Sequence, residues 1–262
     1  MSVVLLDGEI VHYEVLGRGR PVIFLHGWVG SWRYWISSMQ VASTSFRAYA
    51  LDLWGFGDTA HKKERYGIQT QKELVRSFLD EMGIGKIALV GHGLGALVAL
   101  DFASTYKDIV DRAMLVNCSL DMTKVNQKLF KNSPEELVNW LSSDSPEVKK
   151  TLADASKTNM DAIRASQNET KIPQLFNAVN RQHTPCLLVS GAHDKLIEQP
   201  SITQISELSD FSHHILLDEA GHFPMLETAS TFNRLLSDFL ALDSGLSIKQ
   251  LKLKEEWKRR VR

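Results

Sequence analysis

The segment IALVGHGLGALVA, from Ile87 to Ala99, decides the fold. An apolar, strand-like run leads into glycines at alternate positions, and an apolar run suited to a helix starts directly after them. A strand that turns at once into a helix crowds its own backbone, so small residues are needed on both sides of the bend. Gly91 and Gly95 fill these places. The segment therefore predicts a buried central strand, a sharp bend at Gly93 and a helix.

Further short apolar runs on both sides of this segment indicate the other strands of a sheet. Pro21–Leu25 is continuously apolar, as a strand covered on both faces must be. Val3–Val15 is typical of an antiparallel hairpin at a sheet edge, with a turn at residues 17–19. Amphipathic stretches such as Thr70–Met82 and Ala96–Thr105 alternate with the apolar runs, which indicates βαβ units. The remaining strands are expected at Arg47–Leu53, Ile87–Val90, Ala113–Val116, Cys186–Val189 and His214–Leu217.

The sequence therefore predicts an α/β fold, a doubly wound and mostly parallel sheet of about eight strands. The alternation stops between Ser119 and His183, where short amphipathic helices are expected, including Ser133–Leu141 and Ser145–Lys157, each opened by Ser-Pro. We interpret residues 120–183 as a helical cap inserted after the sixth strand. Residues 1–119 and 184–262 then form one core, which ends in a basic tail at 249–262 that we expect to be a solvated helix.

The glycine-rich bend and four further motifs resemble the α/β-hydrolase family, in its cap-bearing, esterase-like and epoxide-hydrolase-like group. The motifs follow the family's order over nearly the whole chain: FLHGW (24–28), DLWGFGD (52–58), GHGLG (91–95), GAHD (191–194) and AGHFP (220–224). The resemblance implies that Asp194 and His222 are the acid and the base of a triad. It also implies an oxyanion hole formed by the backbone N–H groups of Trp28 and Leu94. The candidate pocket residues are His26, Gly27, His92, Trp32 and Phe223.

The nucleophile of this triad is missing, because Gly93 stands where the family carries serine. Glycine has no side chain to attack a carbonyl, and loss of the serine from a triad costs about 10⁶ in turnover, or roughly 8 kcal/mol of barrier. Three interpretations stay open. Gly93 replaces a serine in an ordinary ester or acyl hydrolase, by mutation or allelic change. Alternatively, Asp194 and His222 act as a general base on water or substrate in the vacated space, or the pocket binds a small ligand without catalysis.

Two other assignments at the site compete with these. Asp121 follows the preceding strand and is an alternative to Asp194 as the acid. Cys118 also lies near the expected pocket edge, but no motif couples it to His222, so we expect an inert buried thiol. The cluster Trp28, Trp32, Tyr34 and Trp35 suits a packed core and a pocket wall equally, and the second role would favour an apolar substrate.

The sequence gives little support for a cofactor-binding or a metal-binding site. The residues from Gly91 to Ala96 also fit a dinucleotide-binding turn, but such folds need an acidic residue about 20 positions later at the end of the next strand. Asp111 precedes its strand instead. The nine histidines are dispersed, and the adjacent His213 and His214 would point to opposite faces of a strand. We therefore expect neither a cofactor nor a metal.

Charge and composition narrow the class of partner. The net charge of -1 gives no field that would gather nucleic acid, and 44% hydrophobic with 23% charged residues is ordinary globular composition. The N-terminus lacks the features of a signal peptide, and no run of about 20 apolar residues predicts a membrane span. We expect a cytoplasmic protein with a small-molecule partner, an apolar acyl or ester-like ligand. Cys118 and Cys186 are expected as reduced thiols at opposite edges of the sheet, and the sequence leaves the oligomeric state open.

Overall fold

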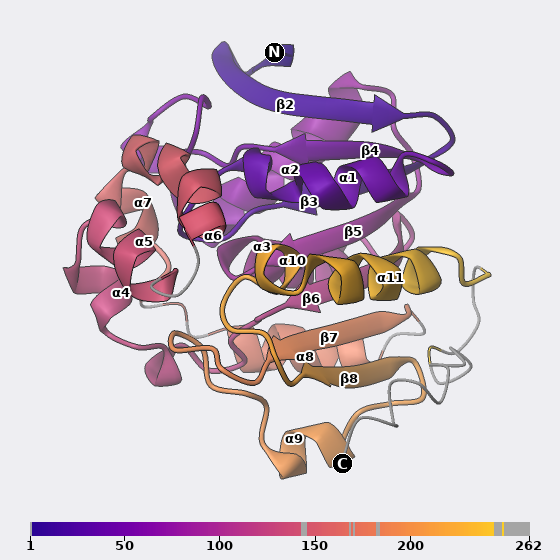
Figure 1. Ribbon diagram of the computed structural model, residues 1–262. Coiled ribbons are helices and arrows are strands. Elements are labelled where there is room, and N and C mark those ends of the chain that lie inside the picture. The colour runs from indigo at the N-terminus through magenta and orange to yellow at the C-terminus, as the bar shows by residue number, and fades with distance from the viewer. Residues whose placement is uncertain are drawn as a thin grey trace.

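A computed structural model describes residues 2–142, 146–167, 169, 171–181, 184–243 and 248 of the chain. Its strands are β1 (Ser2–Leu6), β2 (Glu9–Gly17), β3 (Arg20–Leu25), β4 (Phe46–Leu51), β5 (Ile87–His92), β6 (Val110–Val116), β7 (Cys186–Gly191) and β8 (Ser212–Leu217). They form one sheet in the order β1-β2-β4-β3-β5-β6-β7-β8 (Figure 1). β2 runs antiparallel to β1 and β4, and all other neighbouring pairs are parallel. The predicted mostly parallel α/β sheet is confirmed.

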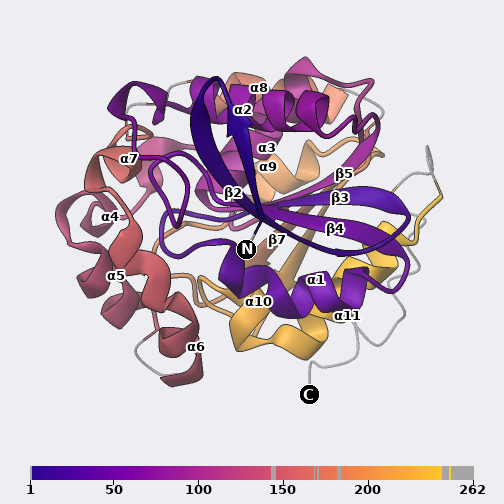
Figure 2. The same ribbon diagram turned by 90° about the horizontal axis from the view of Figure 1, so that it is seen from above.

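Helices cover both faces of the sheet (Figure 2). One face carries α1 (Ile36–Ala42) and α11 (Ala229–Leu240), which pack against each other. The other carries α2 (Ile68–Glu81), α3 (Leu94–Thr105) and α8 (Ile172–Arg181), in which α3 contacts both neighbours. Every residue of β5 is buried. The segment from Ile87 to Ala99 therefore lies at the centre of the molecule, as its apolar sequence predicts.

A group of short helices lies beyond one end of the sheet (Figures 1 and 2). It comprises the 3-10 helices η3 (Met122–Lys124) and η4 (Leu152–Lys157) with α4 (Lys128–Lys131), α5 (Pro134–Leu141), α6 (Pro146–Thr151) and α7 (Met160–Arg164). Ser133 starts α5 with a capping box, since its side chain accepts from the Glu136 N–H while the Glu136 carboxylate accepts from Ser133. α8 packs on α3 instead of joining this group. The limits of the expected cap, 120–183, stay a prediction.

The N-terminal hairpin turns earlier than the sequence interpretation placed it. Asp7 and Gly8 connect β1 to β2 with φ of +51° and +79°. A two-residue hairpin turn of this kind needs positive φ at both central residues, which Asp-Gly provides. Residues 17–19 instead lead from β2 into β3.

The remaining short helices lie in other connections. They are η1 (Trp32–Trp35), η2 (Lys63–Arg65), α9 (Ile202–Ser206) and α10 (Pro224–Glu227).

The placement of the cysteines was wrong. Cys186 begins β7 and Cys118 follows β6, and these two strands are direct neighbours in the sheet. The two residues therefore lie toward opposite ends of adjacent strands, not at opposite edges. Both are free and buried.

None of the helices in the described part of the chain is long and apolar enough to cross a membrane. The basic tail at 249–262 lies outside the described residues.

Candidate functional site

The bend at Gly93 has the geometry that the sequence predicts. Gly93 joins β5 to α3 with φ +51° and ψ −113°, a combination that side-chain-bearing residues adopt only under strain. A Cβ at Gly91 would lie 2.3 Å from the Gly95 carbonyl oxygen, and a Cβ at Gly95 would lie 2.4 Å from the Leu25 carbonyl oxygen. The flanking glycines are therefore required for the close approach of strand, bend and helix.

Asp194 and His222 are brought together from two neighbouring loops. Asp194 follows β7 and His222 follows β8, and Nδ1 of His222 lies 2.9 Å and 3.1 Å from the two carboxylate oxygens. The carboxylate also accepts from the Leu196 N–H at 2.7 Å, which fixes its orientation. Both side chains are almost fully buried. Among the described residues, Nε2 of His222 has no hydrogen-bond partner.

The imidazole of His222 lies beside the bend. Its ring centroid is 4.7 Å from that of His92, the residue that precedes Gly93. Phe223 packs edge-on against it at 4.9 Å. The dyad and the bend thus belong to one site, and two of the candidate pocket residues, His92 and Phe223, lie in it.

An aromatic ring lies against Gly93, the position that lacks the nucleophile. Cε3 and Cζ3 of Trp28 lie 3.0 Å from the place where a Cβ of residue 93 would stand. Trp28 is fully buried, and its indole N–H donates to the Ser166 hydroxyl at 2.8 Å. A Cβ at position 93 would therefore require the Trp28 ring, whose N–H donates to Ser166, to shift by a few tenths of an ångström.

The turn after β3 is held by His26 and Tyr34. Leu53 N–H donates to Nε2 of His26 at 3.0 Å, so the ring proton is on Nδ1, which donates to the Gly27 carbonyl at 2.8 Å. Burial lowers the pKa of His26, which keeps the ring neutral. Because C=O and N–H point to opposite sides of a trans peptide, this bond turns the Trp28 N–H away from His26. His26 thus supports the backbone, and Gly27 donates its own N–H to the Tyr34 hydroxyl.

The first turn of α3 contains one N–H without an acceptor among the described residues. Gly95 N–H donates to the His26 carbonyl, while the N–H groups of Ala96 and Leu97 both reach the Gly93 carbonyl. Leu94 N–H has no such partner in the described part of the chain. A free N–H at a helix N-terminus is a donor for a negatively charged oxygen.

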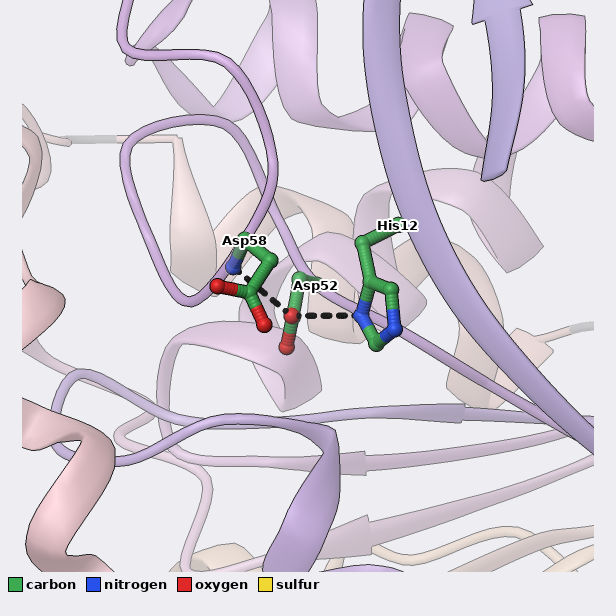
Figure 3. Close-up of side chains that lie close together, drawn as sticks. All are labelled: His12, Asp52 and Asp58. Carbon is green, nitrogen blue, oxygen red and sulfur yellow. Dashed lines mark hydrogen bonds and ion pairs between the residues drawn. The ribbon is translucent and has the colours of Figure 1, made fainter. Parts of the chain in front are cut away.

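Trp32 lies apart from this site. Its backbone N–H donates to Asp52 at 2.8 Å, and its ring packs on His12 at 5.8 Å. Of the candidate pocket residues, Trp32 is the one that the structure places with a different cluster. That cluster contains His12, Asp52 and Asp58, drawn in Figure 3.

The cluster in Figure 3 has donors close enough together to hold a metal ion, although the dispersed histidines did not predict one. Its polar atoms are engaged, however. One oxygen of Asp52 lies 2.9 Å from Nδ1 of His12 and accepts from the Asp58 N–H at 3.1 Å, and the other accepts from Trp32. The Asp58 carboxylate pairs with the Lys157 ammonium at 2.8 Å, a cation that would repel a metal ion. These contacts favour a structural role.

The two competing assignments find no geometric support. The Asp121 carboxylate accepts from the N–H and hydroxyl of Thr123, and these bonds lower its pKa. His222 pairs with Asp194 instead. Burial raises the pKa of the Cys118 thiol far above its usual range, and burial raises that of Cys186 to about 12. Neither thiol is thus a reactive thiolate at neutral pH.

Around His222, Asn117 and Glu227 were not singled out in the sequence, and Tyr34 was named only within the aromatic cluster that suits a core and a pocket wall equally. Asn117 donates to the His222 carbonyl at 2.9 Å, Tyr34 reaches the site through His92, and Glu227 accepts from the Gly221 N–H. Burial raises the pKa of Glu227, although the N–H groups of Gly221 and Phe223 oppose that shift. Asn117 could have been suspected because it directly follows a predicted strand. The roles of Tyr34 and Glu227 have no comparable local signal.

A cavity of about 350 Å³ reaches His222 from the side of the loops that follow β7 and β8. Its wall mixes charged groups with apolar ones, including Leu141, Val148, His193, Lys195, Glu219 and Leu226. Trp28 is not part of this wall. The cavity therefore gives access to the dyad at His222.

The chain is similar to a known protein family and to several known hydrolases. The family model described as alpha/beta hydrolase fold matches residues 20–159. The chain is 22% identical over 262 residues to 2-hydroxy-6-oxo-6-(2'-aminophenyl)hexa-2,4-dienoic acid hydrolase of Metapseudomonas resinovorans, covering 89% of this chain and 88% of that protein. It is 31% identical over 113 residues to a soluble epoxide hydrolase of a Corynebacterium species, covering 43% of this chain and 40% of that protein.

Among solved structures, the enol-lactonase from Burkholderia xenovorans superimposes with a TM-score of 0.76 at 17% identity, covering 92% of this chain and all of that one. At this identity the likeness concerns the fold alone.

Proposed function

Since this chain belongs to the alpha/beta hydrolase fold family, we propose that Asp194 and His222 act as a general base that activates water against a small ester or similar acyl substrate. No covalent intermediate forms at residue 93. One observation carries this proposal: Nδ1 of His222 is committed to Asp194, whereas Nε2 has no partner among the described residues. A neutral imidazole that donates from Nδ1 offers its lone pair at Nε2, which is the state that a base needs.

The proposed reaction has two steps: it forms one bond from the water oxygen to the carbonyl carbon, breaks the bond to the leaving group, and carries one proton from water to the leaving group through His222. Nε2 of His222 accepts a proton from water while the water oxygen attacks the substrate carbonyl, and Asp194 stabilises the resulting imidazolium. The tetrahedral intermediate then expels its leaving group, which takes the proton back from His222. General-base catalysis of this kind contributes about 10²–10⁴ in rate, which is well below what a complete triad provides.

Two backbone groups are suited to the negative charge of the intermediate. We assign this role to the N–H groups of Leu94 and Trp28. Leu94 N–H lies at the N-terminus of α3, without an acceptor among the described residues, and the helix dipole favours an anion there. The bond from His26 to the Gly27 carbonyl turns the Trp28 N–H away from His26.

The substrate class follows from the space around the dyad. A cavity of about 350 Å³ suits a small molecule. His222 lines this cavity, so we expect the substrate to enter through it and to bring its carbonyl to the N–H groups of Leu94 and Trp28. The relatives are named as hydrolases of an epoxide, a dienoic acid and an enol lactone. Their names support hydrolysis as the reaction class and leave the individual substrate to experiment.

Ligand binding without turnover is a second candidate, favoured by the Trp28 indole. The Trp28 ring lies against Gly93, and Ser166 accepts its indole N–H, so the ring narrows the space at the bend. In this case the cavity binds its ligand and the dyad only shapes the wall. The two candidates differ in whether His222 affects the rate of a reaction.

Hydrolysis of p-nitrophenyl acetate by four forms of the full chain separates these candidates. We expect slow hydrolysis by the native chain, loss of it in His222→Ala, and faster hydrolysis in Gly93→Ser. Gly93→Ala is the matched control, because alanine meets the same positive φ and the same indole without supplying a hydroxyl. Equal rates for the native chain and His222→Ala would reject the general base and leave binding alone.

A further inference from the structure

A buried chain of hydrogen bonds joins the two halves of the site. Gly27 N–H, in the turn after β3, donates to the Tyr34 hydroxyl, which lies 2.9 Å from Nδ1 of His92. Nε2 of His92 lies 2.7 Å from the His222 carbonyl, in the loop after β8. We propose that Tyr34 and His92 form a positioning relay that sets the backbone of His222 relative to the turn at Trp28. The inference rests on the proposed function for its catalytic consequence.

The direction of every bond in the relay follows from elementary chemistry. The His222 carbonyl can only accept, so Nε2 of His92 must carry a proton. In a neutral ring, Nδ1 then has a lone pair and accepts from the Tyr34 hydroxyl, whose oxygen accepts in turn from the Gly27 N–H. The reverse order would place two acceptors against each other at the His222 carbonyl.

Burial keeps both side chains in the protonation states that the relay needs. It lowers the pKa of His92 well below 6.5, with the nearby His222 and His26 acting in the same direction. It raises the pKa of Tyr34 well above 10, so the phenol keeps its proton. His92 is fully buried and Tyr34 is 1% exposed. Solvent water therefore has little access to replace either bond.

Other side chains hold the same loop from other sides. The amide of Asn117 donates to the carbonyls of His222 and Gly221 at 2.9 Å and 3.1 Å. Its oxygen accepts from the Gly191 N–H at 2.9 Å, at the end of the strand that leads to Asp194. Glu227 accepts from the Gly221 N–H. The loop of His222 is irregular backbone. These side chains therefore provide the hydrogen bonds to its carbonyl and N–H groups that backbone partners provide in a sheet or helix.

The relay matters because it is the connection between the base and the proposed oxyanion turn. In the described part of the chain, the His222 carbonyl receives two donors, His92 and Asn117, and of these two it is His92 that leads back to Gly27 through Tyr34. A base misplaced by about 1 Å can lose about 10²-fold in rate. Tyr34 and His92 have no place in the proposed proton transfer, so they are positioning residues.

Nitrogen NMR of the histidine rings in the full native chain tests the relay without any substrate. We expect His92 in the Nε2–H tautomer, with Nδ1 unprotonated. In Tyr34→Phe, the nitrogen signals of both His92 and His222 should shift, because the donor to Nδ1 is lost and the loop relaxes. Tyr49→Phe is the matched control, since Tyr49 is equally buried but packs on Tyr13 and Phe78.

An Nδ1–H tautomer of His92 in the native chain would overturn the relay, and that measurement needs no variant. Unchanged His222 signals in Tyr34→Phe would overturn it as well. These results are independent of turnover. If the native chain hydrolyses no ester but His92 has the expected tautomer, the proposed function is rejected and the relay is supported. Where turnover is present, we expect Tyr34→Phe to lower kcat by up to about 10²-fold with little change in KM.

Discussion

His12 and His222 both pair through Nδ1 with a buried aspartate, and the shortest nitrogen–oxygen distance is 2.9 Å in each case. They differ at the other ring nitrogen. Nε2 of His12 lies 3.4 Å from a carboxylate oxygen of Glu14, within reach of an ion pair although not aligned for a hydrogen bond. Nε2 of His222 faces no carboxylate among the described residues. Both nitrogens of the His12 ring therefore lie near a carboxylate, whereas Nε2 of His222 lies near none among the described residues.

The two aspartates differ in the same way. Asp52 accepts from His12 and from the N–H groups of Trp32 and Asp58, and thereby ties three separate segments together. Asp194 accepts from His222 and from the N–H groups of its own loop, at Leu196 and Ile197. A His–Asp pair is therefore not a site by itself. What distinguishes the candidate base is that its residue lines a cavity: of the two histidines, His222 lines the cavity described above and His12 does not.

Matched Asp→Asn substitutions should separate the two pairs most sharply. Asp52→Asn breaks a buried pair and turns an amide NH₂ toward N–H donors, so we expect a loss of about 3–5 kcal/mol in the free energy of unfolding. Asp194→Asn should cost less stability but reduce turnover by about 10²–10⁴, the whole contribution of the base, because His222 then takes the wrong tautomer. Denaturant unfolding and turnover per folded molecule measure the two effects. A reversed pattern would contradict the distinction drawn between the pairs.

The free energy of unfolding should change with pH because His12 titrates differently in the folded and unfolded states. Burial alone would lower the pKa of His12, but the bond to Asp52 and the charges of Asp52, Glu14 and Asp58 raise it. The stabilisation is therefore fully present below about 6.5 and is lost as pH rises through the pKa of the folded state. Each unit by which the pKa of His12 in the folded state exceeds that in the unfolded state adds about 1.4 kcal/mol to the free energy of unfolding.

His12→Gln is the variant that isolates this contribution. We expect the difference in unfolding free energy between the native chain and His12→Gln to shrink as pH rises above 6.5. Urea unfolding at a series of pH values measures it. A difference that grows with pH would mean that His12 is neutral in the folded state, and the contrast with His222 would disappear.

The smallest expected effect concerns the tryptophans beside the two pairs. Trp32 packs on His12, whereas Trp28 covers Gly93 and donates to Ser166. Ser166→Ala leaves a buried indole N–H without its acceptor, at a cost of about 1–3 kcal/mol. Ser156→Ala, at an exposed hydroxyl of η4, is the control. Thermal unfolding measures the loss, and equal melting temperatures for the two variants would show that the bond does not hold the indole over Gly93.

Local sequence patterns predicted the sheet, and the resemblance to the α/β-hydrolase family implied the pair Asp194 and His222, which the structure brings together. Gly91 and Gly95 report a close backbone approach that only glycine allows. Asp194 and His222 each follow an apolar strand, and the carboxyl ends of parallel strands share one edge, where functional side chains can meet. Such signals lie within a few residues of the feature that they predict.

The features that sequence could not predict depend on contacts between distant segments. Whether Trp28 leaves or fills the space over Gly93 depends on Ser166, which lies 138 residues further along the chain. Tyr34 and His92 are 58 residues apart, and Asn117 and His222 are 105 apart. The error on the cysteines has a similar origin, because strand order fixes which strands are neighbours and an apolar run does not encode it.

Rapid mixing of the native chain with p-nitrophenyl acetate, followed by intact mass analysis, distinguishes a base that activates water from a residue that forms an acyl intermediate. We predict nitrophenol release that is linear from the first turnover, depends on His222, and leaves the mass of the chain unchanged. A burst of one equivalent together with an acetylated chain would contradict the account.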